Sequence, residues 1–89
     1  MLVVNSSNLR SIRGIERLHY LSYLELENNN IINVNPLLEL SRIEKLYLRR
    51  NKIANVQIIE YLQKQGQYKN RCEIGAQTVP TEQELNEAW

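Results

Sequence analysis

The side chains that most often catalyse reactions or bind metals are scarce in this chain. It has one histidine, His19, and one cysteine, Cys72, and all of its acidic side chains are glutamates. A catalytic triad needs a nucleophile, a base and an orienting acid, and a zinc site needs several Cys or His ligands at short spacing. We therefore expect no enzymatic activity, no metal site and no cofactor, and we interpret Cys72 as a small buried residue.

The charged side chains could instead bind a partner, and they are unevenly distributed. The net charge is +1, but residues 42–72 carry eight Lys and Arg against two Glu, whereas residues 73–89 carry four Glu and no base. The basic block includes Lys45, Arg49, Arg50, Lys52, Lys69 and Arg71. This asymmetry fits either a basic surface for an acidic partner or a tail that folds back on its own domain.

An RNA-binding adaptor that uses the basic region 42–72 is one alternative that follows from this charge pattern. Such a protein would bind with an affinity that falls steeply with salt. Glu27 and Glu44 interrupt the basic residues, and the total charge is close to zero, so a nucleic acid is the less favoured partner. The chain also lacks an apolar run of about 18 residues and the layout of a signal peptide, so we expect a soluble, cytoplasmic protein without membrane contact.

An internal sequence repeat determines how these side chains are positioned. The segment 21–31, LSYLELENNNI, recurs as the segment 43–53, IEKLYLRRNKI, so the period is 22, with apolar residues and one Asn at matching places. Shifting the pattern by one period towards the amino terminus keeps every core place apolar, and only the Asn changes, to Ser7. A period of this length is typical of stacked repeat units.

The pattern L-x-x-L-x-L-x-x-N-x-L resembles the 22-residue subclass of leucine-rich repeats, seen in bacterial internalins and in a leucine-rich regulatory subunit of type-1 protein phosphatase. The resemblance covers residues 2–62 and includes the step from Ile31 to Val34, which recurs from Ile53 to Val56. It implies an α/β fold: a short solenoid with a curved parallel sheet of three or four strands and helical segments on the convex side. It also implies protein binding on the concave face without catalysis.

We therefore expect one domain over residues 1–89, with repeats at about 1–20, 21–42 and 43–64 and a degenerate last strand and cap at 65–89. Asn29 and Asn51 should form a buried ladder that satisfies the backbone of the turns. Asn35 followed by Pro36 predicts the N-cap and start of a helical segment. The centre of the core should consist of Leu24, Leu26, Leu46 and Leu48.

The last part of the chain departs from the repeat. A strand at about 67–73 is expected, with Tyr68 in the place of Leu46 if the period of 22 continues, although a register shifted by a bulge fits nearly as well. The side chains expected to turn inward are Tyr68, Cys72 and Ile74. A strict continuation of the period conflicts with this placement, because it turns Cys72 outward together with Gln67, Lys69 and Arg71.

A short terminal helix is predicted after this strand. Thr81 and Glu84 have the spacing of a capping box, directly after Pro80. The resemblance to repeat proteins closed by a strand and a helix implies a cap. We expect this helix to seal the last repeat, with Val79, Leu85 and Trp89 against the open end of the core.

The candidate binding residues lie at the places of the repeat that point to the concave side. Neighbouring parallel strands lie about 4.8 Å apart, so Glu27 should lie beside Arg49 and Glu25 beside Tyr47. Tyrosine and arginine are enriched in protein interfaces. The residues that we assign to a protein partner are Tyr23, Glu25, Glu27, Lys45, Tyr47, Arg49, Arg50, Lys69 and Arg71.

A second alternative is self-association through the first strand, whose edge has no preceding repeat in the sequence. Unpaired edges and apolar ends are pairing sites, so two copies could form a homodimer there. The residues assigned to this contact are Leu2, Val3, Val4 and Leu9, and Ile12 and Ile15 beneath them are expected to face water. The chain could equally be a fragment of a longer repeat protein.

Overall fold

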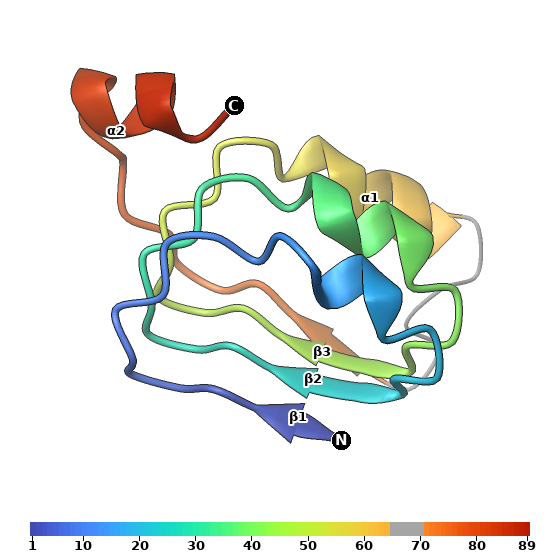
Figure 1. Ribbon diagram of the computed structural model, residues 1–89. Coiled ribbons are helices and arrows are strands. Elements are labelled where there is room, and N and C mark those ends of the chain that lie inside the picture. Colours follow the sequence, from blue (N-terminus) through green and yellow to red (C-terminus); the bar gives the residue numbers. More distant parts are fainter. Residues whose placement is uncertain (65–70) are drawn as a thin grey trace.

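Four short parallel strands form one layer of the molecule, and helical segments cover one face of them (Figure 1). The computed structural model describes residues 1–64 and 71–89. The strands follow each other in sequence order across the sheet, as β1 (Leu2–Val3), β2 (Tyr23–Glu25), β3 (Lys45–Tyr47) and β4 (Arg71–Glu73). The predicted α/β class and parallel sheet are confirmed.

Each parallel strand requires a return segment that crosses back over one face of the sheet. The first two returns are short 3-10 helices and the third is an α-helix: η1 (Ile15–Arg17), η2 (Asn35–Glu39) and α1 (Gln57–Lys64). The three lie side by side on the same face (Figure 1). Helix α2 (Glu82–Glu87) follows β4, and none of the helices in residues 1–64 and 71–89 has the length and apolar character needed to cross a bilayer.

The first three strands keep the spacing of the sequence repeat. Leu24 pairs with Leu2 on one side and with Leu46 on the other, a shift of one full period each time. Residues one repeat apart therefore lie next to each other in the sheet. The side chains at one position of the repeat form a row across the strands. The predicted register of β1, β2 and β3 is confirmed.

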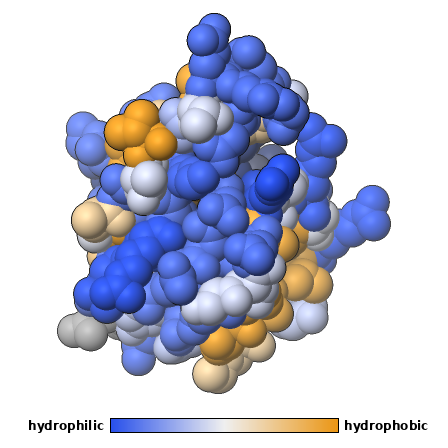
Figure 2. Space-filling view, turned by 90° about the vertical axis from the view of Figure 1, so that its left-hand side faces the viewer, coloured by the Kyte–Doolittle hydropathy of each residue, from blue (hydrophilic) through white to orange (hydrophobic). Residues whose placement is uncertain are grey.

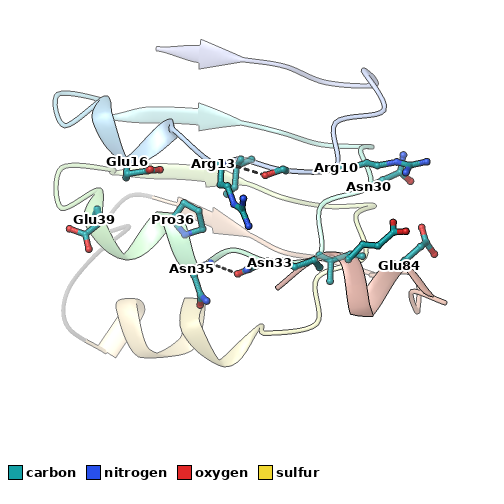
Figure 3. A pocket seen from close by; sticks show the side chains of 14 residues that line it. Arg10, Arg13, Glu16, Asn30, Asn33, Asn35, Pro36, Glu39 and Glu84 are labelled. Atoms are coloured by element: carbon teal, nitrogen blue, oxygen red, sulfur yellow. Dashed lines mark hydrogen bonds between the residues drawn. The ribbon is translucent and has the colours of Figure 1, made fainter. Parts of the chain in front are cut away.

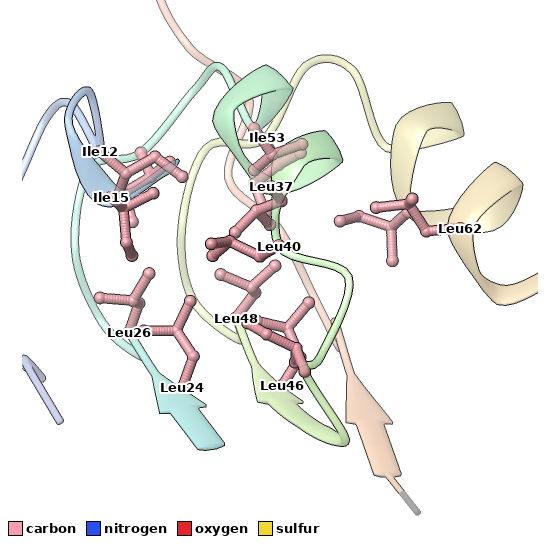
Figure 4. Close-up of a cluster of buried hydrophobic side chains, with 14 of the residues drawn as sticks. Ile12, Ile15, Leu24, Leu26, Leu37, Leu40, Leu46, Leu48, Ile53 and Leu62 are labelled. Atoms are coloured by element: carbon pink, nitrogen blue, oxygen red, sulfur yellow. The ribbon is translucent and has the colours of Figure 1, made fainter. Parts of the chain in front are cut away.

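The core lies between the sheet and the return segments (Figure 4). The four predicted central leucines, Leu24, Leu26, Leu46 and Leu48, are at most 1% exposed. Leu37 from η2 and Ile59 from α1 meet them from the other side. Complete burial of a leucine or isoleucine side chain contributes about 1.5 to 3 kcal/mol, so this layer contact is a large part of the stability.

The start of the chain is better covered than the sequence indicates. Ile12 and Ile15 were expected to face water, but they are 5% and 8% exposed and belong to the core. Leu9 and Leu18 pack against this end of the core, so the first return segment closes over it. The prediction of an open apolar end beneath β1 was wrong.

Two buried asparagines hold the turns that follow β2 and β3, as predicted. The Nδ2 group of Asn51 donates to the carbonyls of Leu48, in its own repeat, and of Leu26, in the preceding one, over 3.0 and 2.9 Å. Its Oδ1 accepts from the backbone N–H of Ile31 over 3.1 Å. Asn29 makes the corresponding bonds one repeat earlier, to the carbonyls of Leu26 and Val4. Each side chain thus binds its own turn to its neighbour.

The fourth strand does not keep the period of 22. Leu46 pairs with Cys72, so the third repeat contains four residues more than the others. The prediction that Tyr68 takes the place of Leu46 in the next repeat was therefore wrong. Its return segment is an α-helix, which rises about 1.5 Å per residue, whereas a 3-10 helix rises about 2.0 Å. More residues are therefore needed to cross the sheet. Cys72 and Ile74 pack against the core as expected, and Tyr68 lies outside the described residues.

Gln77 takes the place of the ladder asparagine in this longer repeat. Its Nε2 donates to the carbonyls of Leu48 and Ile74 over 2.9 and 2.8 Å, and its Oε1 accepts from the N–H of Ile53 over 3.0 Å. A glutamine makes the same three bonds as Asn51 because its carboxamide carries the same donors and acceptor on a longer stem. This residue was not expected from the sequence, because the strict period points to Glu73 as the counterpart of Asn51.

A second ladder of amides supports the return segments and corrects the prediction for Asn35. That residue is not the N-cap but the first residue of η2, after Val34. Its Oδ1 accepts from Nδ2 of the buried Asn55, which also donates to Oδ1 of Asn33. The Oδ1 of Asn55 accepts from the N–H of Val34 over 3.1 Å. The Asn-rich stretches after the strands therefore have a structural role.

Replacing Asn51 by Ala should lower the free energy of unfolding substantially. The side chain is 1% exposed, and its loss leaves the Ile31 N–H without its partner in the interior. It also removes one of the two amide donors from each of the Leu26 and Leu48 carbonyls, which keep only Asn29 and Gln77. Each unsatisfied buried group costs about 1 to 3 kcal/mol. Urea denaturation followed by circular dichroism would measure the change. Asn86→Ala, on the exposed part of α2, is the control, and equal stability of the two variants would contradict the ladder.

Candidate functional site

The candidate binding surface is the face of the sheet opposite η1, η2 and α1, which we call the open face. Side chains alternate across a strand, so the residues on either side of each buried leucine point to this face. In β2 the half-exposed Tyr23 and Glu25 flank the buried Leu24, and in β3 Lys45 and Tyr47 flank Leu46. The structure thus brings the predicted residues of these two strands together.

A hydrogen-bonded aromatic cluster occupies the middle of the open face. The Tyr23 hydroxyl donates to Oε2 of Glu25 over 2.6 Å, and the Asn5 amide donates to Oε1 over 2.7 Å. The rings of Tyr23 and Tyr47 lie 5.6 Å apart and are tilted by 44°, a favourable geometry for an aromatic pair. The predicted neighbours Glu25 and Tyr47 are direct partners in the register.

These bonds also fix the ionisation of the cluster. The hydrogen bond to Glu25 raises the pKa of Tyr23 to about 12, and desolvation and the negative charge of Glu25 add to this effect. The same bond, followed by the one from Asn5, lowers the pKa of Glu25. At neutral pH the cluster is therefore a carboxylate that accepts from a neutral phenol and a neutral amide.

The predicted pair of Glu27 and Arg49 forms the next row of the open face. Nε of Arg49 donates to Oε2 of Glu27 over 2.9 Å. The stem of Arg49 lies over Gly75, where an added Cβ would come within 2.6 Å of the Arg49 Cγ. Gly75 also has a φ of +57°, which favours glycine. Arg49 therefore lies between an acidic neighbour that follows β2 and a glycine that follows β4.

Glu73 is the residue of the open face that the sequence analysis missed. It pairs with Tyr47 on the side opposite Glu25, so Tyr47 lies between two glutamates in adjacent strands. The negative charge of Glu73 acts on Arg49, whose pKa is raised mainly by the bond to Glu27. Only the four extra residues of the third repeat bring Glu73 to this position, so a strict period could not have revealed it.

Of the remaining predicted residues, Lys45 and Arg50 lie at the margins of this face. Lys45 is exposed and pairs with Tyr23 in β2 and with Arg71 in β4, which places Arg71 beside Lys45 and not beside Arg49 as the strict period implied. Arg50 is exposed in the turn after β3 and has a φ of +60°. Cys72, which the strict period turned outward, pairs with the buried Leu46, and Lys69 and Gln67 lie outside the described residues.

The residues proposed for self-association are mostly covered within the chain itself. Leu2, Val4 and Leu9 are partly buried against the core, and Val3 is 45% exposed. In addition, the hydroxyl of Ser7 donates to the carbonyl of Asn5 over 2.9 Å, beside the edge of β1. The apolar surface that a second copy could bury at this edge is therefore smaller than expected.

Burial keeps the thiol of Cys72 protonated at neutral pH. The residue is half-buried beneath β4, and this burial, with the nearby charge of Glu73, raises the pKa of its thiol to about 11. A reactive cysteine needs a thiolate at neutral pH, and thus a lowered pKa. The interpretation of Cys72 as a packing residue agrees with this environment.

The terminal helix has the predicted capping box but not the predicted contacts. The Thr81 Oγ1 accepts from the N–H of Glu84, and Oε1 of Glu84 accepts from the N–H of Thr81. However, α2 has no buried residue, and Val79 and Trp89 are 86% and 56% exposed, so α2 does not seal the last repeat. The expected apolar contact is replaced by polar ones.

Two polar contacts hold α2 against the turns of the second and third repeats. Nζ of Lys52 lies 2.6 Å from Oε2 of Glu84, and Nδ2 of Asn33 donates to the carbonyl of Ala88 over 3.0 Å. The acidic tail thus folds back on the basic block, one of the two arrangements that the charge distribution allowed. The end of the molecule that includes these turns is mainly hydrophilic (Figure 2).

A groove of about 590 Å³ lies between α2 and the first two return segments (Figure 3). Its floor includes Ile12, Ile32 and Pro36. Glu16 and Glu39 lie at one end, and Arg10 and Glu84 lie at the other, with Arg13 between them. Its charged lining residues are two arginines and four glutamates: Arg10, Arg13, Glu16, Glu39, Glu84 and Glu87.

No protein-family model, no curated protein and no solved structure matches this chain. Among the residues that the structure describes, no group of three or more potential metal ligands lies close together. The site is therefore defined by its own geometry: a pair of tyrosine rings, one of them hydrogen-bonded to Glu25, with glutamates on the neighbouring strands and bases on and after β3.

Removing the Lys52 charge should raise the pKa of Glu84 and loosen α2. The bond from Lys52 is the main reason that this pKa is lowered from 4.5 to about 2, and the N–H of Thr81 adds to it. Because the pKa is lowered in the folded state, the stabilisation is complete above about pH 4.5 and is lost as the pH falls towards 2. In Lys52→Met the pKa of Glu84 in the folded state should lie closer to 4.5, so the pH-dependent stabilisation is smaller and its loss is complete at a higher pH.

The side-chain carboxyl resonance of Glu84 and the amide exchange rates of α2 would report both effects during an NMR pH titration. Lys64→Met removes a lysine from the exposed side of α1 and should leave the titration unchanged. An identical Glu84 titration in Lys52→Met and the wild-type protein would show that the ion pair does not hold α2.

Proposed function

We propose that this chain is a short leucine-rich repeat domain of the 22-residue subclass. The resemblance of residues 2–62 to that subclass supports this proposal. Two further observations agree with it: the shift of one full period between β1, β2 and β3, and the buried Asn29 and Asn51 at the repeated turn positions. In this view the open face of the sheet is the concave face, and η1, η2 and α1 form the convex side.

The domain acts as a non-enzymatic module that binds another protein through its open face. The observation that carries this proposal is the half-exposed pair of Tyr23 and Tyr47, which is held in place by the bonds between Tyr23, Glu25 and Asn5. Tyrosines contribute strongly to protein interfaces, and side chains that are already ordered lose little entropy on binding. The ion pair between Glu27 and Arg49 supports the same surface from the adjacent row.

The ionisation of the cluster supports a binding role over a catalytic one. A general acid or base works best when its pKa lies near the working pH. Tyr23 has a pKa of about 12, and the pKa of Glu25 is lowered below its ordinary value, so both are moved away from neutrality. The cluster therefore supplies fixed donors, acceptors and ring surfaces and does not transfer protons at neutral pH.

Charges of both signs on the open face favour a protein over a nucleic acid as the partner. Lys45, Arg49 and Arg50 would attract phosphates, but three glutamates lie among them: Glu25 on β2, Glu27 after β2 and Glu73 on β4. Carboxylates near a phosphate backbone oppose the counterion release on which such binding depends. A protein surface can place opposite charges at each of these positions.

Site-directed photo-crosslinking tests this function. The photoreactive residue p-benzoylphenylalanine would replace Tyr47 on the open face or, as the matched control, the exposed Tyr61 on α1. After irradiation in the source cells, the Tyr47 variant should give a discrete crosslinked band that contains a second protein. The Tyr61 variant should give none, because α1 lies on the other side of the sheet.

The alternatives give different bands. A crosslinked product at twice the mass of the chain would mean self-association, and a product that nuclease removes would mean a nucleic acid partner. Equal labelling at the two positions, or none at Tyr47, would contradict a protein-binding role of the open face.

A further inference from the structure

We propose that the open face takes an arginine or lysine side chain of its partner over the ring of Tyr47, between Glu25 and Glu73. This inference rests on the proposed protein-binding function and specifies the chemistry of the partner. It depends on the register of β4, which places a second carboxylate beside Tyr47.

The positions of the three residues follow from the strand pairing. Tyr47 pairs with Glu25 in β2 and with Glu73 in β4, so the two glutamate backbones lie about 10 Å apart, on opposite sides of one aromatic residue. The alternation along each strand directs these three side chains to the same face. All three are half-exposed, so a side chain from outside can reach them.

Neither carboxylate forms an ion pair among the described residues, although Glu73 lies close enough to Arg49 for their charges to interact. Tyr23 and Asn5, which are both neutral, donate to the two oxygens of Glu25. The ion pairs that the structure describes in residues 1–64 and 71–89 join Arg49 to Glu27 and Lys52 to Glu84. Neither pair includes Glu25 or Glu73, so the row across Tyr47 carries a negative charge that a partner can neutralise.

The bases nearest to Tyr47 in the sequence are Lys45 and Arg49, which lie two residues before and after it. Arg49 follows two residues later and is bound to Glu27, which cancels most of its repulsion. Lys45 precedes Tyr47 by two residues and is exposed, so its flexible side chain can move away. A cation over Tyr47 therefore meets two carboxylates outside these ion pairs, whereas Lys45 and Arg71 lie one pairing step away, two residues before Tyr47 and Glu73.

Arginine fits this arrangement better than lysine. A guanidinium group is flat, so it can stack on the tyrosine ring while its edge N–H groups donate sideways. The strand pairing puts Glu25 and Glu73 on the two sides of Tyr47 towards which such donors would point. A lysine would gain the electrostatic attraction but could not stack and donate to both carboxylates at once.

NMR titrations with small probes test the inference directly. The probes are N-acetylarginine amide and its uncharged analogue N-acetylcitrulline amide, and the signals are the ring resonances of Tyr23 and Tyr47. The arginine probe should shift these resonances in a saturable way at low salt, with a dissociation constant on the order of millimolar for one exposed contact. The citrulline probe should bind much more weakly, because it keeps the shape without the charge.

Variants then assign the binding to individual residues. Glu25→Gln and Glu73→Gln keep the size of each side chain, and each should weaken arginine binding by about threefold. Tyr47→Leu should abolish the shift of the Tyr23 ring. The controls are Glu60→Gln on α1, which should change nothing, and Lys45→Gln, which should not weaken binding. Circular dichroism would establish that every variant is folded.

Equal binding of the arginine and citrulline probes would overturn the inference. So would tighter binding of N-acetylglutamate amide, or a loss in Glu60→Gln as large as that in Glu73→Gln. If Tyr47 crosslinks to a protein but no arginine probe binds, the interface remains and the cation site is wrong. If the arginine probe binds and Tyr47 gives no crosslink, the site exists but the proposed protein-binding function fails.

Discussion

The buried amide side chains at the turns are the interaction on which the rest of this structure depends. The chain leaves each strand through a turn with a positive φ, +58° at Asn28 and +60° at Arg50, and such a turn directs backbone donors and acceptors inward. Water cannot reach these groups, so a side chain must satisfy them. Asn29, Asn51 and Gln77 do so, and each also bonds to the preceding repeat. The ladder therefore fixes the turns and the register of the strands together.

This register determines which side chains meet on the open face. Because β2 and β3 are aligned by exactly one period of the repeat, Tyr23 reaches Tyr47 and Glu27 reaches Arg49. Because β4 is shifted by four further residues, a glutamate lies where the strict period would place a base. The charge pattern that we connect with a cationic side chain of a partner is therefore a consequence of the longer α1 return.

Much of this architecture could be predicted because the repeat is local and periodic. The parallel sheet, the core leucines, the Asn29 and Asn51 ladder and the capping box at Thr81 all depend on residues at fixed spacing, and all were predicted correctly. The register of β4 could not be predicted, because the number of residues in a return segment depends on whether it winds as a 3-10 helix or as an α-helix. Glu73 and Gln77 were missed for this reason.

The contacts of the terminal helix could not be predicted from the sequence for a different reason. The capping box determines where α2 starts but not what it contacts, and α2 is held by Lys52 and Asn33, which are far away in the sequence. An apolar seal was expected from Val79 and Trp89, yet both remain exposed. Long-range polar pairs of this kind leave no periodic signal.

The register of β4 is the central claim, and scalar couplings across hydrogen bonds test it most directly. Such couplings connect the nitrogen of a donor amide to the carbonyl carbon of its acceptor. The N–H of Leu48 donates to the carbonyl of Glu73 over 2.8 Å, so a coupling between these two residues is expected. A coupling from Leu48 to the carbonyl of Lys69 would mean that the period of 22 continues. That result would remove Glu73 from the side of Tyr47 and contradict the account.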